Sequence, residues 1–346
     1  MTRAVEPPRG GEAAALATRL KAQAYGIGFD LAGIAPLGPA ASAPHYDEWL
    51  ARGFAASMDY MHRHADLRRD ASRPQPGMRS ALVVALDYGG REPAGPVARY
   101  ARGDDYHRVM WRRLDALGDW LRAEAGAATR AFVDTGPVLE RELARRAGLG
   151  WFGKNTMLIN PRLGSFFFIG ALFTELTLPP DAPFEEDHCG TCRRCLDACP
   201  TEAFAAPRML DAARCISYLT IEHRGAIDPA LAPLVGDHLY GCDVCQEVCP
   251  WNRRFARELR EPAFRPRPAA RGADAVSLAR EWLAMDDAAY AEAFRNSAMK
   301  RAKRAGLRRN AEVVIANREA AASIPAPGPA PGTRVPSGNA EPVPRR

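Results

Sequence analysis

Residues 188–200 have the sequence HCGTCRRCLDACP, and residues 242–250 have the sequence CDVCQEVCP. Both runs end in C-x3-C-P, and Cys215 lies alone between them. Together they account for all eight cysteines of the chain. A [4Fe–4S] cluster is held by four cysteine thiolates, so eight cysteines supply two clusters. The spacing therefore predicts an iron–sulfur protein.

The spacing also predicts how the cysteines divide between the clusters. In two-cluster ferredoxin modules, three closely spaced cysteines hold one cube and the cysteine before proline reaches the other. An x2 spacing directs thiolates to neighbouring irons, whereas the x3 step starts a helix that turns the next sulfur away. The expected sets are Cys189, Cys192, Cys195 and Cys249, and Cys199, Cys215, Cys242 and Cys245. Zinc is the alternative, but two zinc sites would not need two runs that each end in C-x3-C-P.

Composition places these motifs in a soluble protein. Of 346 residues, 47% are hydrophobic and 25% charged, which is typical of a globular chain with a core. No stretch reaches the roughly 18 apolar residues that a membrane helix needs. The first residues lack the apolar region of a signal peptide, so we expect a cytoplasmic protein without membrane contact. A reducing compartment argues against disulfides.

Apolar periodicity predicts alternating helices and strands before the cysteines, and hence an α+β or α/β domain. Helices are expected at about 12–26, 108–125 and 138–147, and strands at 80–87, 129–133 and 165–178. The expected domains are 1–180 (the α+β, α/β-like domain), 181–260 (a ferredoxin-like module), 261–320 (a helical basic region) and 321–346 (a disordered Pro/Ala-rich tail).

Between residues 300 and 309 the chain has six cations and no acid. Such a run predicts a surface for phosphates, and a solvated helix face is the alternative. The cations are Lys300, Arg301, Lys303, Arg304, Arg308 and Arg309.

Two clusters conduct electrons, so a reaction centre must lie elsewhere in the chain. The N-terminal half offers the segments YARGDDYH (100–107), VDTGP (133–137) and GWFGKN (150–155). It contains neither a GxGxxG that opens a helix nor a P-loop, so nucleotide binding by those routes is unsupported. Asp134 follows an expected strand; a turn-forming aspartate is the alternative to a catalytic one.

The segments VDTGP, GLGWFGKN, INPRLGSFFFIGALFTEL and MKRAKRAGLRRN, with both cysteine motifs, together resemble the epoxyqueuosine reductase family. The resemblance covers about residues 12–318. It implies a base-off cobalamin between the N-terminal domain and the ferredoxin module, and reductive removal of the epoxide oxygen of epoxyqueuosine. The product is queuosine at the wobble position of tRNA, in the last step of queuosine biosynthesis. It also implies a tRNA anticodon stem-loop and an external electron donor such as a flavodoxin or ferredoxin as partners, and a monomer.

The resemblance implies that Asp134 is the general acid. We expect desolvation beside residues 166–168 to keep this carboxyl group protonated. Besides Asp134, the candidates for cobalamin contact are Met58, Tyr106, Lys154, Asn155 and Ser217; Tyr106 and Asp104 are second-tier candidates to line the pocket. Caps, turns and core packing are the alternatives for these six.

No D-x-H-x-x-G motif occurs, which agrees with cobalamin binding without a histidine ligand. The chain departs from longer family members because a Pro/Ala-rich stretch soon follows Asn317, so we expect the final helical pair of those members to be absent. Two other functions compete: a reductive dehalogenase-like corrinoid reductase, and a ferredoxin subunit without chemistry of its own. The first is usually exported, and the second leaves about 180 preceding residues unexplained.

Overall fold

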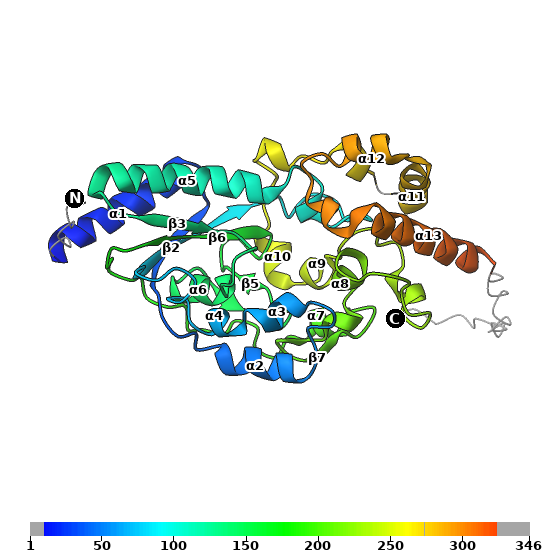
Figure 1. Cartoon of the computed structure of the whole chain (residues 1–346). Helices are drawn as coiled ribbons and strands as arrows, with labels where there is room; N and C mark the ends of the chain where they lie inside the picture. Colours follow the sequence, from blue (N-terminus) through cyan, green and yellow to red (C-terminus); the bar gives the residue numbers. More distant parts are fainter. Residues whose placement is uncertain (1–9, 273, 324–346) are drawn as a thin grey trace, which may run out of the picture.

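The computed structural model describes residues 10–272 and 274–323. The N-terminal half is built on a four-stranded sheet of order β1-β2-β6-β3, in which every neighbouring pair is antiparallel (Figure 1). The domain is therefore α+β. The strands are β1 Leu31–Pro36, β2 Ser80–Asp87, β3 Thr129–Phe132, β4 Trp151–Phe152, β5 Leu158–Ile159, β6 Phe167–Thr174, β7 Phe204–Ala206 and β8 Met209–Leu210.

The central strand β2 is buried along its whole length because helices cover both faces of the sheet. Leu82 and Val84 pack into a core with helices α1 (Gly10–Gly26) and α5 (Tyr106–Ala125), whereas Ala81 and Val83 pack with helix α6 (Glu140–Arg146) on the other face. Side chains alternate between faces along a strand, so a strand covered on both sides needs an uninterrupted apolar run. The run SALVVALD meets that need.

The α-helices are mostly short, and only α1, α5 and α13 exceed ten residues among those described. Their bounds are α1 Gly10–Gly26, α2 Ala43–Ala51, α3 Asp59–Arg63, α4 Ala65–Arg69, α5 Tyr106–Ala125, α6 Glu140–Arg146, α7 Arg194–Asp197, α8 Ile216–Ile221, α9 Val244–Glu247, α10 Pro250–Phe255, α11 Ala275–Ala284, α12 Asp287–Ala293 and α13 Lys303–Ala322. Short 3-10 helices are η1 Arg99–Ala101, η2 Ala212–Arg214, η3 Ala232–Val235, η4 Pro262–Phe264, η5 Pro268–Ala270 and η6 Ala298–Ala302.

The cysteine segment lies between the sheet domain and a C-terminal helical layer of α11, α12 and α13 (Figure 1). A separate core holds that layer together, with Trp282, Phe294 and Leu307 among its buried residues. The buried side chain of Asn310 ties α13 to the cysteine segment, because its amide donates 2.8 Å hydrogen bonds to the carbonyls of Thr220 and Leu239.

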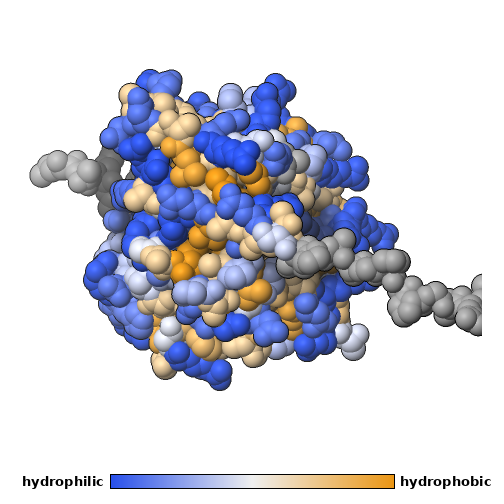
Figure 2. Space-filling view, turned by 90° about the vertical axis from the view of Figure 1, so that its right-hand side faces the viewer, coloured by the Kyte–Doolittle hydropathy of each residue, from blue (hydrophilic) through white to orange (hydrophobic). Residues whose placement is uncertain are grey.

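The surface is mixed in polarity. Figure 2 shows apolar residues near the middle of one face, between hydrophilic margins. Within the described ranges, no helix combines the length and the apolar character needed to cross a bilayer.

The predicted helices at 12–26 and 108–125 are confirmed as α1 and α5, and the predicted strand at 80–87 as β2. The strand expected at 165–178 is shorter, because the sheet pairing covers only β6. Sequence patterns missed β1 and the helices α2–α4. The predicted disordered tail falls mostly on residues 324–346, outside the described residues.

Candidate functional site

The structure gathers the cysteines into two sets of four. Cys195 lies close enough to Cys189, Cys192 and Cys249 for their charges to act on its pKa. In the other set, Cys199 and Cys215 act in the same way on Cys242. Cys245 is influenced by Cys242 and Cys215 and also, across the gap between sets, by Cys195. All eight thiols are free of disulfides. Both groups join distant parts of the chain, and the ligation of one cluster by each set stays a prediction.

Helix ends favour anionic sulfur at two of these positions. Cys215 precedes α8, and its sulfur accepts hydrogen bonds from the backbone N–H groups of residues 217 and 218. Cys249 precedes α10, and its sulfur accepts hydrogen bonds from those of residues 251 and 252. Burial opposes ionisation and raises the pKa of Cys242 to about 12. Buried thiolates need a metal or another cation to offset desolvation. The donor set therefore fits iron–sulfur ligation.

The alternative to a cluster is a site for a single metal ion, such as zinc. In the described part of the chain, no three His, Cys, Asp or Glu side chains are grouped so that they could hold one metal ion. The support for clusters rests on the two thiol sets and their order along the chain, because a cube separates its four thiolates more widely than one ion does.

Four predicted cobalamin contacts lie against the cysteine loops and do not line the large pocket described below. Lys154 donates to the carbonyls of Gly190 and Cys192, at 2.5 and 3.0 Å. The Asn155 amide donates to the Cys245 carbonyl at 3.2 Å. Ser217 hydrogen-bonds the Cys215 sulfur, and Met58 packs in a cluster that includes Cys215 and Cys242. Their contact with cobalamin stays a prediction.

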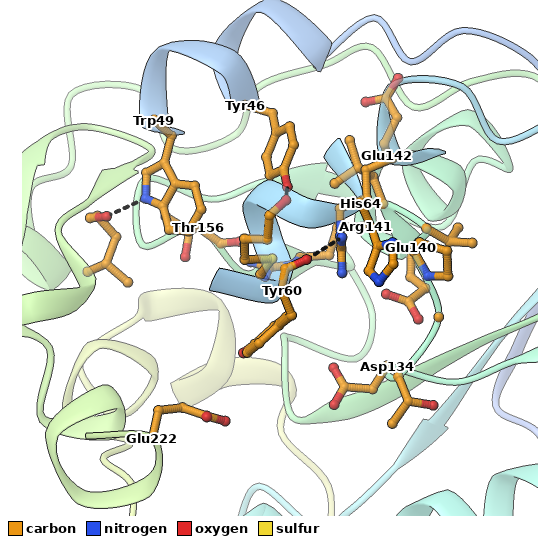
Figure 3. A pocket seen from close by; sticks show the side chains of 18 of the residues that line it. Tyr46, Trp49, Tyr60, His64, Asp134, Glu140, Arg141, Glu142, Thr156 and Glu222 are labelled. Atoms are coloured by element: carbon orange, nitrogen blue, oxygen red, sulfur yellow. Dashed lines mark hydrogen bonds between the residues drawn. The ribbon is translucent and has the colours of Figure 1, made fainter. Parts of the chain in front are cut away.

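A pocket of about 1160 Å3 opens where the three parts of the chain meet. Its walls come from α2–α4, the start of α5, the loop from β3 into α6, the β7–β8 hairpin, the end of α8 and η6. Figure 3 shows Asp134 and Glu140 on one side of the pocket and Glu222 across from them. Of the predicted contacts, Tyr106 and Asp134 line it. Asp104 does not; it pairs with Arg267 at 3.1 Å.

Asp134 occupies the loop between β3 and α6, with a positive φ of 57° that aspartate tolerates better than most residues. The pocket leaves 65% of its side-chain surface open. Tyr106 donates a 2.8 Å hydrogen bond to Asp134 Oδ2, and His107 Nε2 lies 3.5 Å from the same atom. The Tyr106 ring stacks flat on Phe168, with centroids 4.2 Å apart.

These contacts reverse the expected protonation of Asp134. Burial alone would raise the pKa of Asp134, but the close His107 ring, with Nε2 3.5 Å away, and the hydrogen bond from Tyr106 lower it below the ordinary value. The expectation that desolvation retains its proton is therefore wrong for the structure without ligands. Sequence reasoning weighed the apolar surroundings and missed the two donors next to Asp105.

Glu140 is a second acidic group that sequence reasoning missed. Its Oε1 is buried without a hydrogen-bond partner, although the residue as a whole is half-buried. Burial first, and then the nearby charge of Asp134, raise the pKa of Glu140 to about 8, against the effect of the Asp134 backbone N–H. The buried site of Glu140 therefore favours its protonated form. Its position six residues after Asp134 gave no signal in the sequence, because only the turn brings them together.

The six predicted cations divide into two groups. Arg309 donates to the carbonyls of residues 219, 223 and 225, Arg308 to that of residue 283, and Arg304 to that of residue 285 and to Asp287. These three arginine side chains therefore stabilise the fold through hydrogen bonds as well as carrying charge. Lys300, Arg301 and Lys303 are exposed. Arg301 lines the pocket and donates two hydrogen bonds to the carboxylate of Glu222.

Comparison with known proteins gives two family matches. A family described as "Epoxyqueuosine reductase QueG, DUF1730" matches residues 68–135, which end just beyond Asp134. A family described as "4Fe-4S double cluster binding domain" matches residues 188–252, which contain all eight cysteines. The second match agrees with the two thiol sets.

Relatives extend the likeness over most of the chain. Epoxyqueuosine reductase from Xanthomonas campestris pv. campestris is 42% identical over 316 residues, covering 87% of this chain and 86% of the relative. A solved epoxyqueuosine reductase bound to an epoxyqueuosine-modified tRNA-Tyr stem loop aligns with a TM-score of 0.79 at 30% identity, over 89% of this chain and 83% of that chain. The enzyme from Bacillus subtilis, solved with its aspartate catalytic loop swung out of the active site, gives 0.79 at 29% identity, over 89% and 83%.

Proposed function

The chain belongs to the epoxyqueuosine reductase family, and from this premise we propose that it reduces epoxyqueuosine to queuosine at the wobble position of tRNA. One observation supports this most directly: a pocket with a carboxylate, a tyrosine and a histidine at one wall adjoins a module with two thiol quartets. Family membership favours this function over an organohalide reductase. The ionisable residues of the pocket favour the reductase function over that of a ferredoxin subunit that only carries electrons.

The cofactors of the proposal are two [4Fe–4S] clusters and a base-off cobalamin. The cysteine sets would hold the clusters. A pocket of about 1160 Å3 exceeds the roughly 300–1,000 Å3 usual for drug-sized ligands, so it suits a large planar macrocycle. It also borders the segment that carries Cys215, through Leu210 and Ile221. When bound, cobalamin would supply a strongly reducing centre. The chain's own residues would bind the substrate and deliver protons.

We assign the parts of the chain as follows. Residues 1–180 would form the catalytic domain, 181–260 the electron-conducting module and 261–320 the RNA-facing region. An acidic one-electron carrier such as a flavodoxin or ferredoxin would supply electrons, and the protein would act as a monomer on the anticodon stem-loop. Exposed Lys300 and Lys303 are free to meet phosphates, whose neutralisation supplies much of RNA affinity.

The decisive experiment uses protein purified without oxygen. Iron, sulfide and cobalt are measured, and the protein is then incubated with a chemical reductant and either epoxyqueuosine-containing tRNA or an organohalide. Nucleoside analysis of the digested tRNA should show conversion of epoxyqueuosine to queuosine, with no dehalogenation. Zinc in place of iron, or reduction of the organohalide alone, would overturn the proposal. The Cys245→Ser variant serves as the control for electron supply.

A further inference from the structure

His107 is held between two carboxylates that come from different segments. Its Nδ1 lies 2.7 Å from Asp105 Oδ1, and its Nε2 lies 3.5 Å from Asp134 Oδ2. The Nε2 atom is buried and has no hydrogen-bond partner other than this long approach. Tyr106 stacks on the ring with centroids 4.1 Å apart. One nitrogen is therefore anchored and the other is aimed at the pocket carboxylate.

The proton of this array resides on the histidine. Burial opposes a charge on His107, but hydrogen bonds and the charges of Asp105 and Asp134 outweigh it and raise its pKa to about 9. The same contacts lower the pKa of Asp134. At neutral pH the array is thus an imidazolium between two carboxylates. Asp134 faces the pocket as a carboxylate, and two groups with raised pKa values lie beside it, the His107 ring and Glu140.

The proposed reaction needs more protons than one carboxyl group holds. Removing an epoxide oxygen breaks two C–O bonds, forms a C=C bond, and consumes two electrons and two protons as the oxygen leaves as water. The electrons come from a one-electron carrier through the clusters. A single aspartate releases one proton and must then be reloaded before it can give another.

We propose that Asp105 and His107 form a proton relay that reloads Asp134. His107 Nε2 passes its proton to Asp134 Oδ2, Asp134 delivers a proton to the departing oxygen, and the neutral imidazole is reprotonated from solvent. Asp105 keeps Nδ1 protonated and the ring aimed. The relay rests on the proposed function. His107 acts through Asp134 and is a positioning residue.

The surroundings suit this role. The charged groups acting on His107 are Asp105, at the start of its own helix, and Asp134, from the loop after β3. Its other ring contact, Trp111, is itself exposed, and 18% of the His107 side chain reaches solvent. A purely structural role is the alternative, since Asp105 also accepts the His107 backbone N–H and caps α5.

Nuclear magnetic resonance on the protein without cobalamin tests the charge directly. With 15N-labelled histidine, the His107 ring should titrate well above the ordinary 6.5, near pH 9. In an Asp134→Asn variant the midpoint should fall by about one pH unit or more, because one carboxylate is lost. His223, which contacts a backbone carbonyl of its own loop, serves as the reference ring. A His107 midpoint at or below 6.5 would overturn the relay.

Single-turnover kinetics on the loaded enzyme tests the transfer. The wild-type rate should fall as pH rises through the His107 midpoint, because the imidazolium disappears. His107→Gln keeps a polar side chain but cannot relay a proton, so its rate should drop about 100-fold and lose that pH dependence. His223→Gln should match wild type.

The outcomes separate the relay from the function. Full rate in His107→Gln at both pH 7 and pH 9 would refute the relay and leave the reductase assignment intact. Loss of rate with an unchanged pH profile would assign His107 a structural role only. If wild-type protein with full iron and cobalt converted no epoxyqueuosine, the proposed function itself would fail, and the relay with it.

Discussion

Tyr106 joins the pocket acid to the core of the sheet domain. Its hydroxyl donates a 2.8 Å hydrogen bond to Asp134 Oδ2, while its ring lies parallel to that of Phe168, a residue at the start of β6. Phe168 is buried, so it fixes the ring and the ring fixes the carboxylate. Preorganisation of a catalytic group by a locked neighbour avoids reorientation during the reaction.

The Tyr106→Phe variant removes the hydroxyl and keeps the stacking. The pKa of Asp134 should rise, because one hydrogen bond to its charged form is lost. We expect turnover to fall on the order of tenfold, with little change in melting temperature. Steady-state kinetics and differential scanning calorimetry on the same preparation measure both. A large loss of thermal stability would instead mean that the hydroxyl holds the loop together.

Asp134→Asn separates proton transfer from loop geometry. Asparagine tolerates the positive φ of this position and can still accept from Tyr106, whereas alanine would do neither well. Turnover should fall by roughly 10²–10⁴-fold, with iron and cobalt contents unchanged. Activity close to wild type would remove Asp134 from the chemistry.

Glu140→Gln should change how stability depends on pH. The unfolded carboxyl titrates near 4.5 and the folded one near 8, so wild type loses stability as pH rises from 4.5 to 8. The variant cannot ionise and escapes that loss. Its melting temperature relative to wild type should therefore increase from pH 5 to pH 8 and then level off.

Thermal melts in matched buffers check this difference. Glu48→Gln is the control, because Glu48 is about half exposed and pairs with Arg52, which follows the last residue of α2. Its melting temperature should stay parallel to wild type. A flat Glu140→Gln difference across this pH range would mean that Glu140 is ionised in the folded protein.

Crossed ligation predicts which cysteine variants resemble one another. Cys199→Ser and Cys245→Ser lie 46 positions apart but share a set, so both should lose the same cluster and about half of the iron. Cys189→Ser and Cys249→Ser should lose the other cluster. Iron analysis and electron paramagnetic resonance distinguish the two patterns. Pairing of variants by closeness in sequence would contradict the crossed arrangement.

The basic segment predicts two different defects. Arg309→Ala leaves three backbone carbonyls without their donor and should lower stability by about 1–3 kcal/mol. The Lys300 side chain is exposed, so Lys300→Ala should leave stability nearly unchanged. It should weaken stem-loop binding and reduce the salt dependence by about one unit of slope. Equal effects of both variants on RNA binding, with equal stability, would refute this division.

The sequence predicts the parts of this molecule that depend on spacing and periodicity. The cysteine sets follow from fixed intervals, and β2 follows from an apolar run that needs cover on two faces. Helices α2–α4 escaped notice because their residues mix small, polar and aromatic side chains without a clear period. They nevertheless form a wall of the pocket.

Charge and protonation were harder to predict than fold. His107 and Tyr106 lower the pKa of Asp134, and burial beside Asp134 raises the pKa of Glu140. Both effects depend on distances that only the folded chain defines. Likewise, the sequence of a run of cations does not show that the Arg309 side chain donates hydrogen bonds to backbone carbonyls.

Lys154 and Asn155 fasten one loop of the catalytic half to both cysteine loops, through the carbonyls of residues 190, 192 and 245. Under the proposed cluster ligation, the order of the two halves would therefore be coupled. If each cysteine set holds a cluster as proposed, loss of iron, including loss through damage by oxygen, would remove the ligation that holds the loops presenting these carbonyls. The same two side chains would then make exposure to air loosen the catalytic half as well as the module that conducts electrons.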